Sequence, residues 1–199
     1  FLDDDCEVKE DWVEKILAAF CDKDVQAIAG KIIPYDEKNV YSVVSNLSER
    51  HYENVHRQRI YPSLVYNLAV RKTVLKRMGI RFDENIENVA EDIEFNYKLY
   101  KNSIDVIYRE DVVCSHKYPD SFKEFMKDQL HFRKSRSWRV RNLEDYPYVP
   151  GNENTLSRKA KYFFRFPAVC FRYGKDRGVD PFMLFSLAVL QESLYIYHL

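Results

Sequence analysis

The sequence predicts an α/β fold in which helices flank a mixed sheet, with a helical tail at the C-terminal end. Stretches whose apolar residues recur at helical spacing alternate with short β-rich runs, an order typical of α/β sheets. Some connections between the β-rich runs are too short for parallel crossovers, which indicates a mixed sheet. From Lys159 onward the chain becomes aromatic. We therefore expect a sheet-containing part over residues 1–145 and a helical, aromatic-rich extension over residues 146–199.

The first predicted elements surround a run of three aspartates. Phe1 and Leu2 stand directly before these acids and indicate the end of a buried strand whose earlier part would lie before residue 1. The next run of β-rich sequence, Val25 to Ile33, is closed by Pro34 and predicts a strand. Between them, apolar residues at helical spacing follow acidic first-turn residues and predict a helix. These apolar residues are Trp12, Val13, Ile16, Leu17 and Phe20.

The middle of the chain continues the alternation of helices and strands. A strand-like run covers Leu64 to Val70, and the short basic helix after it ends at Gly79, a residue that commonly closes helices. Before this strand, a long polar helix is expected to reach about Arg57. It opens with the apolar residues Val40, Val43, Val44 and Leu47.

The elements before the tail bring further polar residues to helix and strand ends. A helix is predicted to start at Glu91 and Asp92. Two short strands then cover residues 104–108 and 112–114, and the second delivers His116 to its end. The last predicted helix here runs from about residue 121 to 141. Its expected apolar face holds Phe122, Phe125 and Met126.

The tail contains an apolar run, Phe182 to Leu190, that is too short to span a bilayer, which needs about twenty apolar residues. Two interpretations stay open for this region: a core helix docked on the sheet, or a helix lying in a membrane interface. The second is favoured by aromatic residues interleaved with basic ones. They are Tyr162, Phe163, Phe164, Phe166, Phe171 and Tyr173, among Arg158, Lys159, Lys161, Arg165 and Arg172.

The composition limits the partners of the protein. The 199 residues include 31 Lys plus Arg and 31 Asp plus Glu, so the formal net charge is zero and nothing points to a nucleic-acid partner. The four cysteines form no Cys-x-x-Cys pair. They indicate reduced, buried thiols of a cytosolic protein, so we expect a cytoplasmic location, with the inner face of the cell membrane as the place where the tail would bind.

The adjacent carboxylates Asp3, Asp4 and Asp5 are the first candidate site. Three negative charges at a strand end repel one another, and a cation or main-chain N–H groups usually stabilise such a cluster. Alternation along a strand would put Asp3 and Asp5 on one side and Asp4 on the other. A hard divalent ion, Mg²⁺ or Mn²⁺, suits oxygen ligands of this kind. A solvated acidic turn that caps the next helix remains the alternative.

A second carboxylate pair and a histidine extend this hypothesis. Glu91 and Asp92, at a loop and helix start, can supply a general base that removes a proton from an attacking hydroxyl. First-turn acids that only cap the helix are the competing interpretation. His116, at a strand end, is either a further metal ligand or a hydrogen-bonded edge residue.

These features stand in one order along the chain, which is more specific than any single motif. Over roughly residues 1 to 140 this order resembles a family 2 glycosyltransferase of the GT-A fold, and the resemblance implies the C-terminal part of that fold. The segments that carry the resemblance are Phe1-Leu2-Asp3-Asp4-Asp5, Asn67-Leu68-Ala69-Val70-Arg71-Lys72, Gly79-Ile80-Arg81-Phe82-Asp83-Glu84 and Ala90-Glu91-Asp92-Ile93-Glu94-Phe95.

The resemblance implies roles for the acidic motif. Asp3 and Asp5 become the ends of an Asp-x-Asp motif, with Asp5 as the main ligand of Mg²⁺ or Mn²⁺. Asp3 is a further metal ligand and lies nearer the nucleotide, and Asp4 accompanies it in the donor-binding part. The implied donor is a nucleotide-diphosphate sugar, and the implied acceptor is a saccharide or a lipid-linked saccharide.

The same resemblance makes Asp92 the base, with Glu91 before it in the family's Glu-Asp pair, and places His116 near the metal or the donor diphosphate. The implied reaction is a sugar transfer that inverts the anomeric centre, in the synthesis of a polysaccharide or glycoconjugate. The family's first βαβ portion, which holds the base and ribose of the nucleotide, has no counterpart in these residues. We therefore expect this chain alone to be inactive.

Two other classes of protein also fit parts of the sequence. Aspartate clusters hold divalent ions in phosphohydrolases and nucleotidyltransferases. A non-catalytic module that associates with membranes would explain the aromatic and basic tail.

Overall fold

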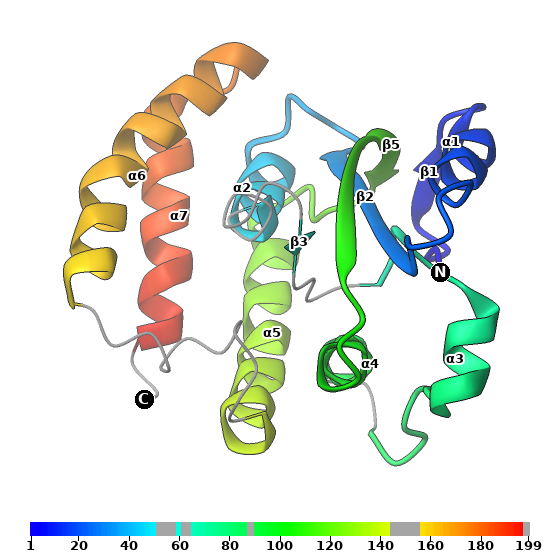
Figure 1. Ribbon diagram of the computed structural model, residues 1–199. Coiled ribbons are helices and arrows are strands. Elements are labelled where there is room, and N and C mark those ends of the chain that lie inside the picture. The colour runs from blue at the N-terminus through cyan, green and yellow to red at the C-terminus, as the bar shows by residue number, and fades with distance from the viewer. Residues whose placement is uncertain (51–58, 61–64, 87–89, 144–155, 197–199) are drawn as a thin grey trace.

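The structure is a computed structural model that describes residues 1–50, 59–60, 65–86, 90–143 and 156–196 (Figure 1). Helices lie on both sides of a central sheet, and α6 and α7 lie side by side beyond α2 and α5. The elements in chain order are β1 (Cys6–Val8), α1 (Trp12–Ala19), β2 (Ala27–Pro34), α2 (Val40–Arg50), β3 (Arg59–Ile60), β4 (Leu68–Val70), α3 (Lys72–Met78), α4 (Glu91–Lys101), β5 (Val106–His116), α5 (Phe122–Asn142), α6 (Leu156–Arg177) and α7 (Pro181–Ile196).

The sheet is mixed, as the sequence predicted. Strand β5 lies parallel to β2 and antiparallel to β1 and β3, and β2 lies antiparallel to β4, so the main order is β1-β5-β2-β4. Both β1 and β3 pair with β5, at its two ends: Cys6 lies opposite His116, and Ile60 lies opposite Val106. The end of β5 therefore meets β1, which directly follows the three aspartates.

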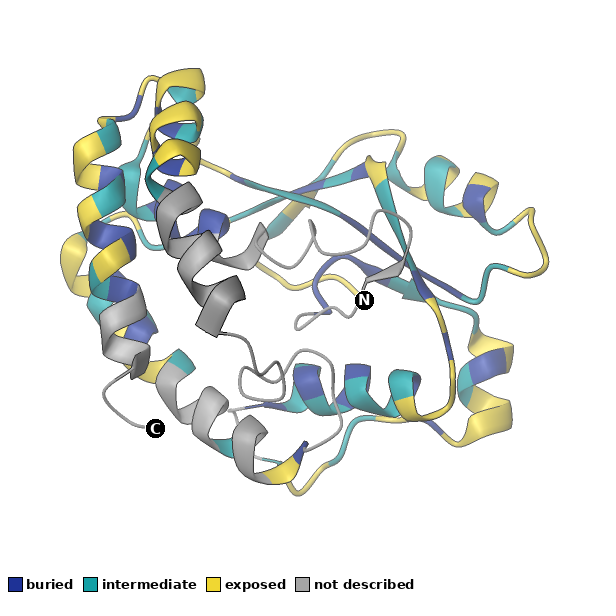
Figure 2. Ribbon diagram, turned by 60° about the vertical axis from the view of Figure 1, so that its left-hand side comes forward, coloured by how far each residue is buried: buried dark blue, intermediate teal, exposed yellow. Residues whose placement is uncertain are grey.

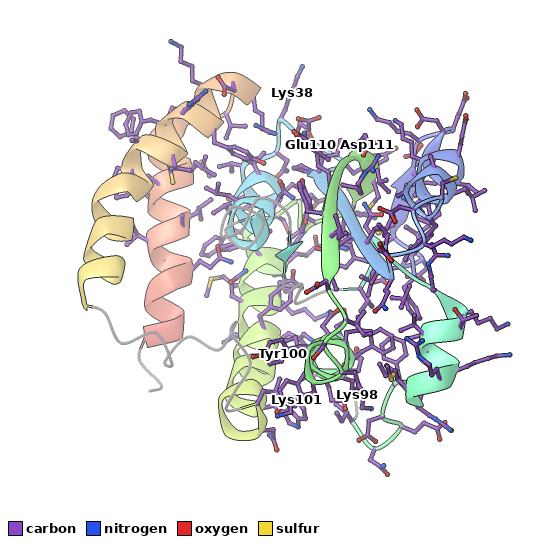
Figure 3. The ribbon with its side chains drawn as sticks, viewed as in Figure 1. Lys38, Lys98, Tyr100, Lys101, Glu110 and Asp111 are labelled. Carbon is purple, nitrogen blue, oxygen red and sulfur yellow. The ribbon has the colours of Figure 1, made fainter. Side chains whose placement is uncertain are left out.

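Strand β5 is one continuous element where the sequence predicted two short strands. Its register with β2 shifts, because Gly30 pairs with Arg109 whereas the next residue, Lys31, pairs with Val113. The residues between them leave the ladder in a β-bulge, which bends a strand and interrupts its sequence pattern. Figure 3 shows Glu110 and Asp111 at this bend. The interruption explains why the sequence pattern showed two runs.

The side chain of Asn67 fills the bulge and joins three strands. Its Nδ2 donates to the carbonyl oxygens of Lys31 at 3.0 Å and Val112 at 3.1 Å, and its Oδ1 accepts from Trp12 Nε1 at 3.0 Å. The backbone N–H of Gly30 donates to the Asn67 carbonyl at 2.8 Å. A Cβ on Gly30 would lie 2.2 Å from the Val112 oxygen, so only glycine permits this approach.

Arg71 ties the end of β4 to the connection between α1 and β2. Its Nε donates to the carbonyl of Val25 at 2.6 Å, and one terminal nitrogen donates to those of Phe20 at 2.6 Å and Asp22 at 2.8 Å. The guanidinium also lies 4.9 Å from the centre of the Phe20 ring. Asn67 and Arg71, two residues of the motif at 67–72, therefore stabilise the fold rather than contribute to the candidate site.

Helix α4 begins where the sequence predicted, at Glu91. Acids occupy its first turn, and Lys98 and Lys101 occupy its last, an arrangement that suits the helix dipole. Figure 3 shows both lysines on this helix, away from the bend of β5. The helix packs Phe95 and Leu99 into the core beside the sheet, and this packing fixes the position of its N-terminal acids.

Side chains alternate between the two faces of the sheet. Ala27 and Ala29 of β2 join the core formed with α3 and α4, whereas Ile28 joins the core formed with α1. Figure 2 shows buried and intermediate residues along the strands and exposed residues on the outer sides of the helices. A separate core joins α2, α5, α6 and α7. It holds Val43, Val44, Leu47, Phe125, Cys170, Val179, Leu184, Leu187 and Ala188.

One interpretation expected the tail to dock on the sheet. In the described residues, α6 and α7 instead share a core with helices α2 and α5. Leu184 and Leu187 of α7 contribute to the core shared with α2, while Phe182 in the same run is 69% exposed. Phe122 of α5, expected on the apolar face, is half exposed because Phe125 and not Phe122 points into that core. Among the described residues, no helix has both the length and the apolar content needed to cross a membrane.

Further expectations need correction or limits. Phe1 and Leu2 lie outside the strands, and the aspartates form a turn before β1, so strand alternation does not orient their side chains. Strand β1 itself was missed, because three residues are too short to show a pattern. Cys21 is exposed, although the cysteines were expected to be buried. The predicted extension of α2 to Arg57 lies beyond Arg50, outside the described residues.

The bulge yields a stability test. Gly30→Ala is expected to lower the free energy of unfolding by about 3 kcal/mol, since the new methyl group would collide with the Val112 carbonyl and the Asn67 side chain. Urea unfolding followed by circular dichroism measures this loss.

Gly79→Ala is the matched control for the Gly30 variant. Gly79 has a φ of 64° and nothing within 4 Å of an added Cβ, so alanine there costs only the left-handed backbone strain, about 1 kcal/mol. Equal losses at the two positions would show that the close approach at Gly30 does not constrain the fold.

Candidate active site

The acidic turn, the end of β5 and the N-terminus of α4 meet at one place. The backbone N–H of Lys117 donates to the Asp5 carbonyl at 3.1 Å and extends the pairing of β1 with β5. As a result, Asp5 Oδ1 lies 3.4 Å from His116 Nε2. Two residues that are far apart in the sequence thus become neighbours through strand pairing.

Aromatic contacts hold the start of the chain against α4. The ring of Phe1 lies edge-on to Phe95, with centroids 5.0 Å apart, and to Phe82, with centroids 5.5 Å apart. Phe95 stands three residues after Asp92, so both side chains lie on the same side of the helix. The aromatic cluster therefore brings the acidic turn toward Asp92.

Asp92 is partly buried at the start of α4, and its carboxylate accepts a hydrogen bond from the backbone N–H of Val65. Burial raises the pKa of Asp92 to about 7, with further contributions from the negative charges of Glu91 and Asp3. A carboxylate that titrates near neutral pH both accepts and releases protons readily, as a general base must.

Neighbouring negative charges also change the pKa of an acid in the turn, Asp3. Burial raises the pKa of Asp3, and the negative charges of Asp5, Asp4 and Glu91 raise it further. Carboxylates from the turn and from α4 therefore share one region of negative potential. Such a region binds a cation favourably, because the cation relieves the repulsion between the acids.

His116 is held between two tyrosine rings. Tyr66 stacks on it with ring centroids 4.4 Å apart, and Tyr118 contacts it edge-on at 4.5 Å. Burial lowers the pKa of His116, although the charge of Asp5 opposes this shift, so the imidazole is favoured in its neutral form. Its Nδ1 is buried and has no hydrogen-bond partner within the described parts of the chain. A neutral imidazole beside a carboxylate is a donor set that fits a divalent cation.

Sequence reasoning missed the polar network behind His116. The hydroxyls of Tyr66 and Tyr118 lie 3.3 Å apart, and Asn46 Nδ2 donates to Tyr118 at 3.2 Å. Tyr173 of α6 in turn donates to Asn46 Oδ1 at 2.6 Å. The sequence did hold one signal for this network: Asn46 is a polar residue among the apolar residues Val43, Val44 and Leu47 on the buried face of α2.

Cys6 is a further residue that sequence reasoning missed. It pairs directly with His116 across β1 and β5, and a donor atom from each of Asp5, Cys6 and His116 lies within 4.8 Å of the other two. A cysteine next to an acidic motif carries no signal in the sequence, because only strand pairing brings it to the histidine.

The structure thus brings together the predicted site residues from three segments. Asp5 lies beside His116, Asp3 is coupled by charge to the other acids of the turn and to Glu91, and Glu91 acts by charge on Asp92. Asp4 contributes its charge to Asp3. The roles of these residues in metal and donor binding stay predictions.

Comparison with known families identifies the family of the chain. The sequence profile of the family described as "Glycosyl transferase family group 2" matches residues 1–166, which is most of the chain. A comparison with curated proteins gave no match.

The raised pKa of Asp92 makes a prediction about stability. Its folded-state pKa of about 7 exceeds the ordinary value of 3.8, so the folded state binds this proton more tightly and the free energy of unfolding falls as the pH rises from about 4 to about 7. Asp92→Asn removes the ionisable carboxyl group and with it this fall in the free energy of unfolding. We expect the variant to be more stable than the wild type by roughly 2 to 4 kcal/mol near pH 8, and the difference to vanish below about pH 4.

Urea unfolding of both proteins across this pH range measures the difference. Asp24→Asn, at an exposed acid in the turn after α1, is the control and should change stability by less than about 0.5 kcal/mol at every pH. A stability difference for Asp92→Asn that stays constant with pH would contradict the shifted pKa.

Proposed function

Because the chain belongs to glycosyl transferase family group 2, we propose that it transfers a sugar from a nucleotide-diphosphate sugar to an acceptor hydroxyl with inversion of the anomeric centre. The observation that carries this proposal is the position of Asp92. Its carboxylate is partly buried, has a pKa raised to about 7 and lies on the side of α4 that faces the acidic turn.

In this mechanism Asp92 takes the proton of the acceptor hydroxyl while the oxygen attacks the anomeric carbon. Glu91 and Asp3 raise the proton affinity of Asp92 through their charges, and the Val65 N–H orients its carboxylate. The hydroxyl oxygen forms the new glycosidic bond, and the bond from the anomeric carbon to the diphosphate breaks. Attack from the face opposite the leaving group inverts the configuration.

Asp5 and His116, with Asp3 beside them, are the residues that would hold Mg²⁺ or Mn²⁺. When bound, the ion neutralises the charge that develops on the leaving nucleoside diphosphate. We assign Asp3 and Asp4, the first two acids of the turn, to binding of the nucleotide. The Tyr66 and Tyr118 rings hold His116 in place for this role.

We also propose a polysaccharide or glycoconjugate pathway at the cytoplasmic face of a membrane, with a saccharide or lipid-linked acceptor. Support comes from the tail, where the exposed rings of Phe171 and Phe182 contact each other, with centroids 4.9 Å apart. The exposed cations Arg172 and Lys175 stand nearby on α6. Aromatic and cationic side chains together suit a membrane surface.

The role of Asp92 is tested in the complete protein with Asp92→Asn. Transfer should fall by about 10²- to 10⁴-fold, the usual contribution of a general base, while donor affinity stays within about twofold. Radiolabelled sugar transfer measures the first quantity, and calorimetry measures the second. Asp24→Asn is the matched control and should retain transfer.

The pH dependence provides a second readout for the same residue. In the wild type, kcat/KM should rise with pH up to about 7 and then level off, because Asp92 must lose its proton before it acts as a base. The residual activity of Asp92→Asn should lack this rise. Retention of the wild-type rate or of its pH profile would refute the assignment of the base.

Asp5→Ala tests the metal site. Calorimetric titration with the donor should show tighter binding in the presence of Mn²⁺ for the wild type, and the variant should lose most of this gain, at least about tenfold in affinity. Donor affinity that is the same with and without Mn²⁺ in the wild type would rule out the metal role. Release of phosphate from simple esters without an acceptor would instead favour a phosphohydrolase.

A further inference from the structure

A third donor group, the thiol of Cys6, stands beside Asp5 and His116. A carboxylate oxygen of Asp5, the Sγ of Cys6 and a ring nitrogen of His116 all lie within 4.8 Å of one another. Cys6 is a half-buried free thiol, and Asp5 is open to solvent, with 45% of its side chain exposed. An ion that approaches from the solvent side of Asp5 therefore reaches all three donors.

Strand pairing places the thiol toward the imidazole. Lys117 bonds to Asp5, so the adjacent Cys6–His116 pair is of the non-hydrogen-bonded kind, in which facing side chains approach most closely. Zinc lies about 2.0 to 2.3 Å from nitrogen and sulfur ligands, so donor atoms on one ion are roughly 3 to 4 Å apart. The three donor atoms, within 4.8 Å of one another, therefore lie close to the spacing that one ion requires.

We propose that Cys6 is a metal ligand, and that Asp5, Cys6 and His116 together bind a borderline divalent ion such as Zn²⁺ or Co²⁺. A set of one oxygen, one nitrogen and one sulfur donor favours such ions over Mg²⁺, which prefers oxygen ligands. On binding, the thiol proton passes to solvent and a sulfur–metal bond forms.

The second thiol nearby does not compete for this role. Cys114 contacts Cys6 but is completely buried, and its Sγ lies 3.9 Å from the Tyr66 carbonyl, to which it donates. The inference rests on the proposed function only in sharing Asp5 and His116, and it adds a ligand and an ion preference to that site.

Cobalt titration of the full chain tests the proposal directly. Co²⁺ bound by a thiolate shows a near-ultraviolet sulfur-to-cobalt charge-transfer band, which oxygen and nitrogen ligands do not produce. We expect the band in the wild type at one equivalent of Co²⁺, and its loss in Cys6→Ser together with at least a tenfold fall in Co²⁺ affinity, about the lower limit for losing a metal-supporting group. Zn²⁺ should displace Co²⁺ and abolish the band, whereas Mg²⁺ should not.

Two cysteine variants serve as controls. Cys21→Ser removes an exposed thiol and Cys114→Ala removes the buried neighbour, and both should keep the band. Circular dichroism of each variant confirms that it is folded, and Cys6→Ala repeats the test with a second side chain. A band that persists in folded Cys6→Ser, or that disappears only in Cys114→Ala, overturns the proposal.

Mn²⁺ separates this inference from the proposed function. Electron paramagnetic resonance of free Mn²⁺ reports its binding, which should remain within about twofold in Cys6→Ser but be lost in Asp5→Ala, because Mn²⁺ prefers an oxygen donor such as the Asp5 carboxylate to a thiolate. Mn²⁺ binding without a cobalt–sulfur band would overturn the role of Cys6 and leave the transferase mechanism standing. A cobalt–sulfur band in a complete protein that transfers no sugar would support Cys6 as a metal ligand and overturn the transferase mechanism.

Discussion

The structure depends on the pairing of β5 along both of its edges. Along one edge, β2 runs parallel to it past the bulge, and along the other, β1 and β3 meet its opposite ends. Two segments of the candidate site are positioned by this strand: His116 is its last residue, and β1 fixes the acidic turn beside it. Loss of the β1 pairing would separate Asp5 from His116, because the described residues show no other backbone hydrogen bond between their two segments.

The bulge explains how a mixed sheet accommodates this arrangement. The Asn67 side chain donates to two carbonyls beside the register shift, and buried carbonyls need such partners. Gly30 makes room for the amide, and Trp12 of α1 bonds to its oxygen. A single polar side chain thus links a helix and three strands, while the acids remain free for the site.

The site is electrostatically costly for the fold. The acidic turn and α4 bring Asp3, Asp5, Glu91 and Asp92 into mutual influence, and burial withdraws water from Asp92. The shared core of α4 and the sheet, with Phe95 and Leu99 almost completely buried, holds the acids together despite their repulsion. Such tension between stability and reactivity is common where a carboxylate must titrate near neutral pH.

The C-terminal helices also support the site from behind. Tyr173 of α6 bonds to Asn46 of α2, Asn46 bonds to Tyr118, and Tyr118 contacts the His116 ring. The chain of contacts is continuous and largely buried, and networks of this kind rigidify the groups at their ends. The tail is therefore part of the structural environment of His116 as well as a candidate membrane contact.

The sequence by itself determined the order of most helices and strands, the mixed sheet and the chemical types at the site, because apolar periodicity, helix ends and motif order are local properties. The acids of the turn and of α4 and the position of His116 at a strand end were all readable in this way. Only the tertiary structure decided that β5 is one strand, that the tail packs on helices, and that Cys6 faces His116. It also decided the pKa of Asp92, since strand pairing and desolvation depend on neighbours that are distant in the sequence.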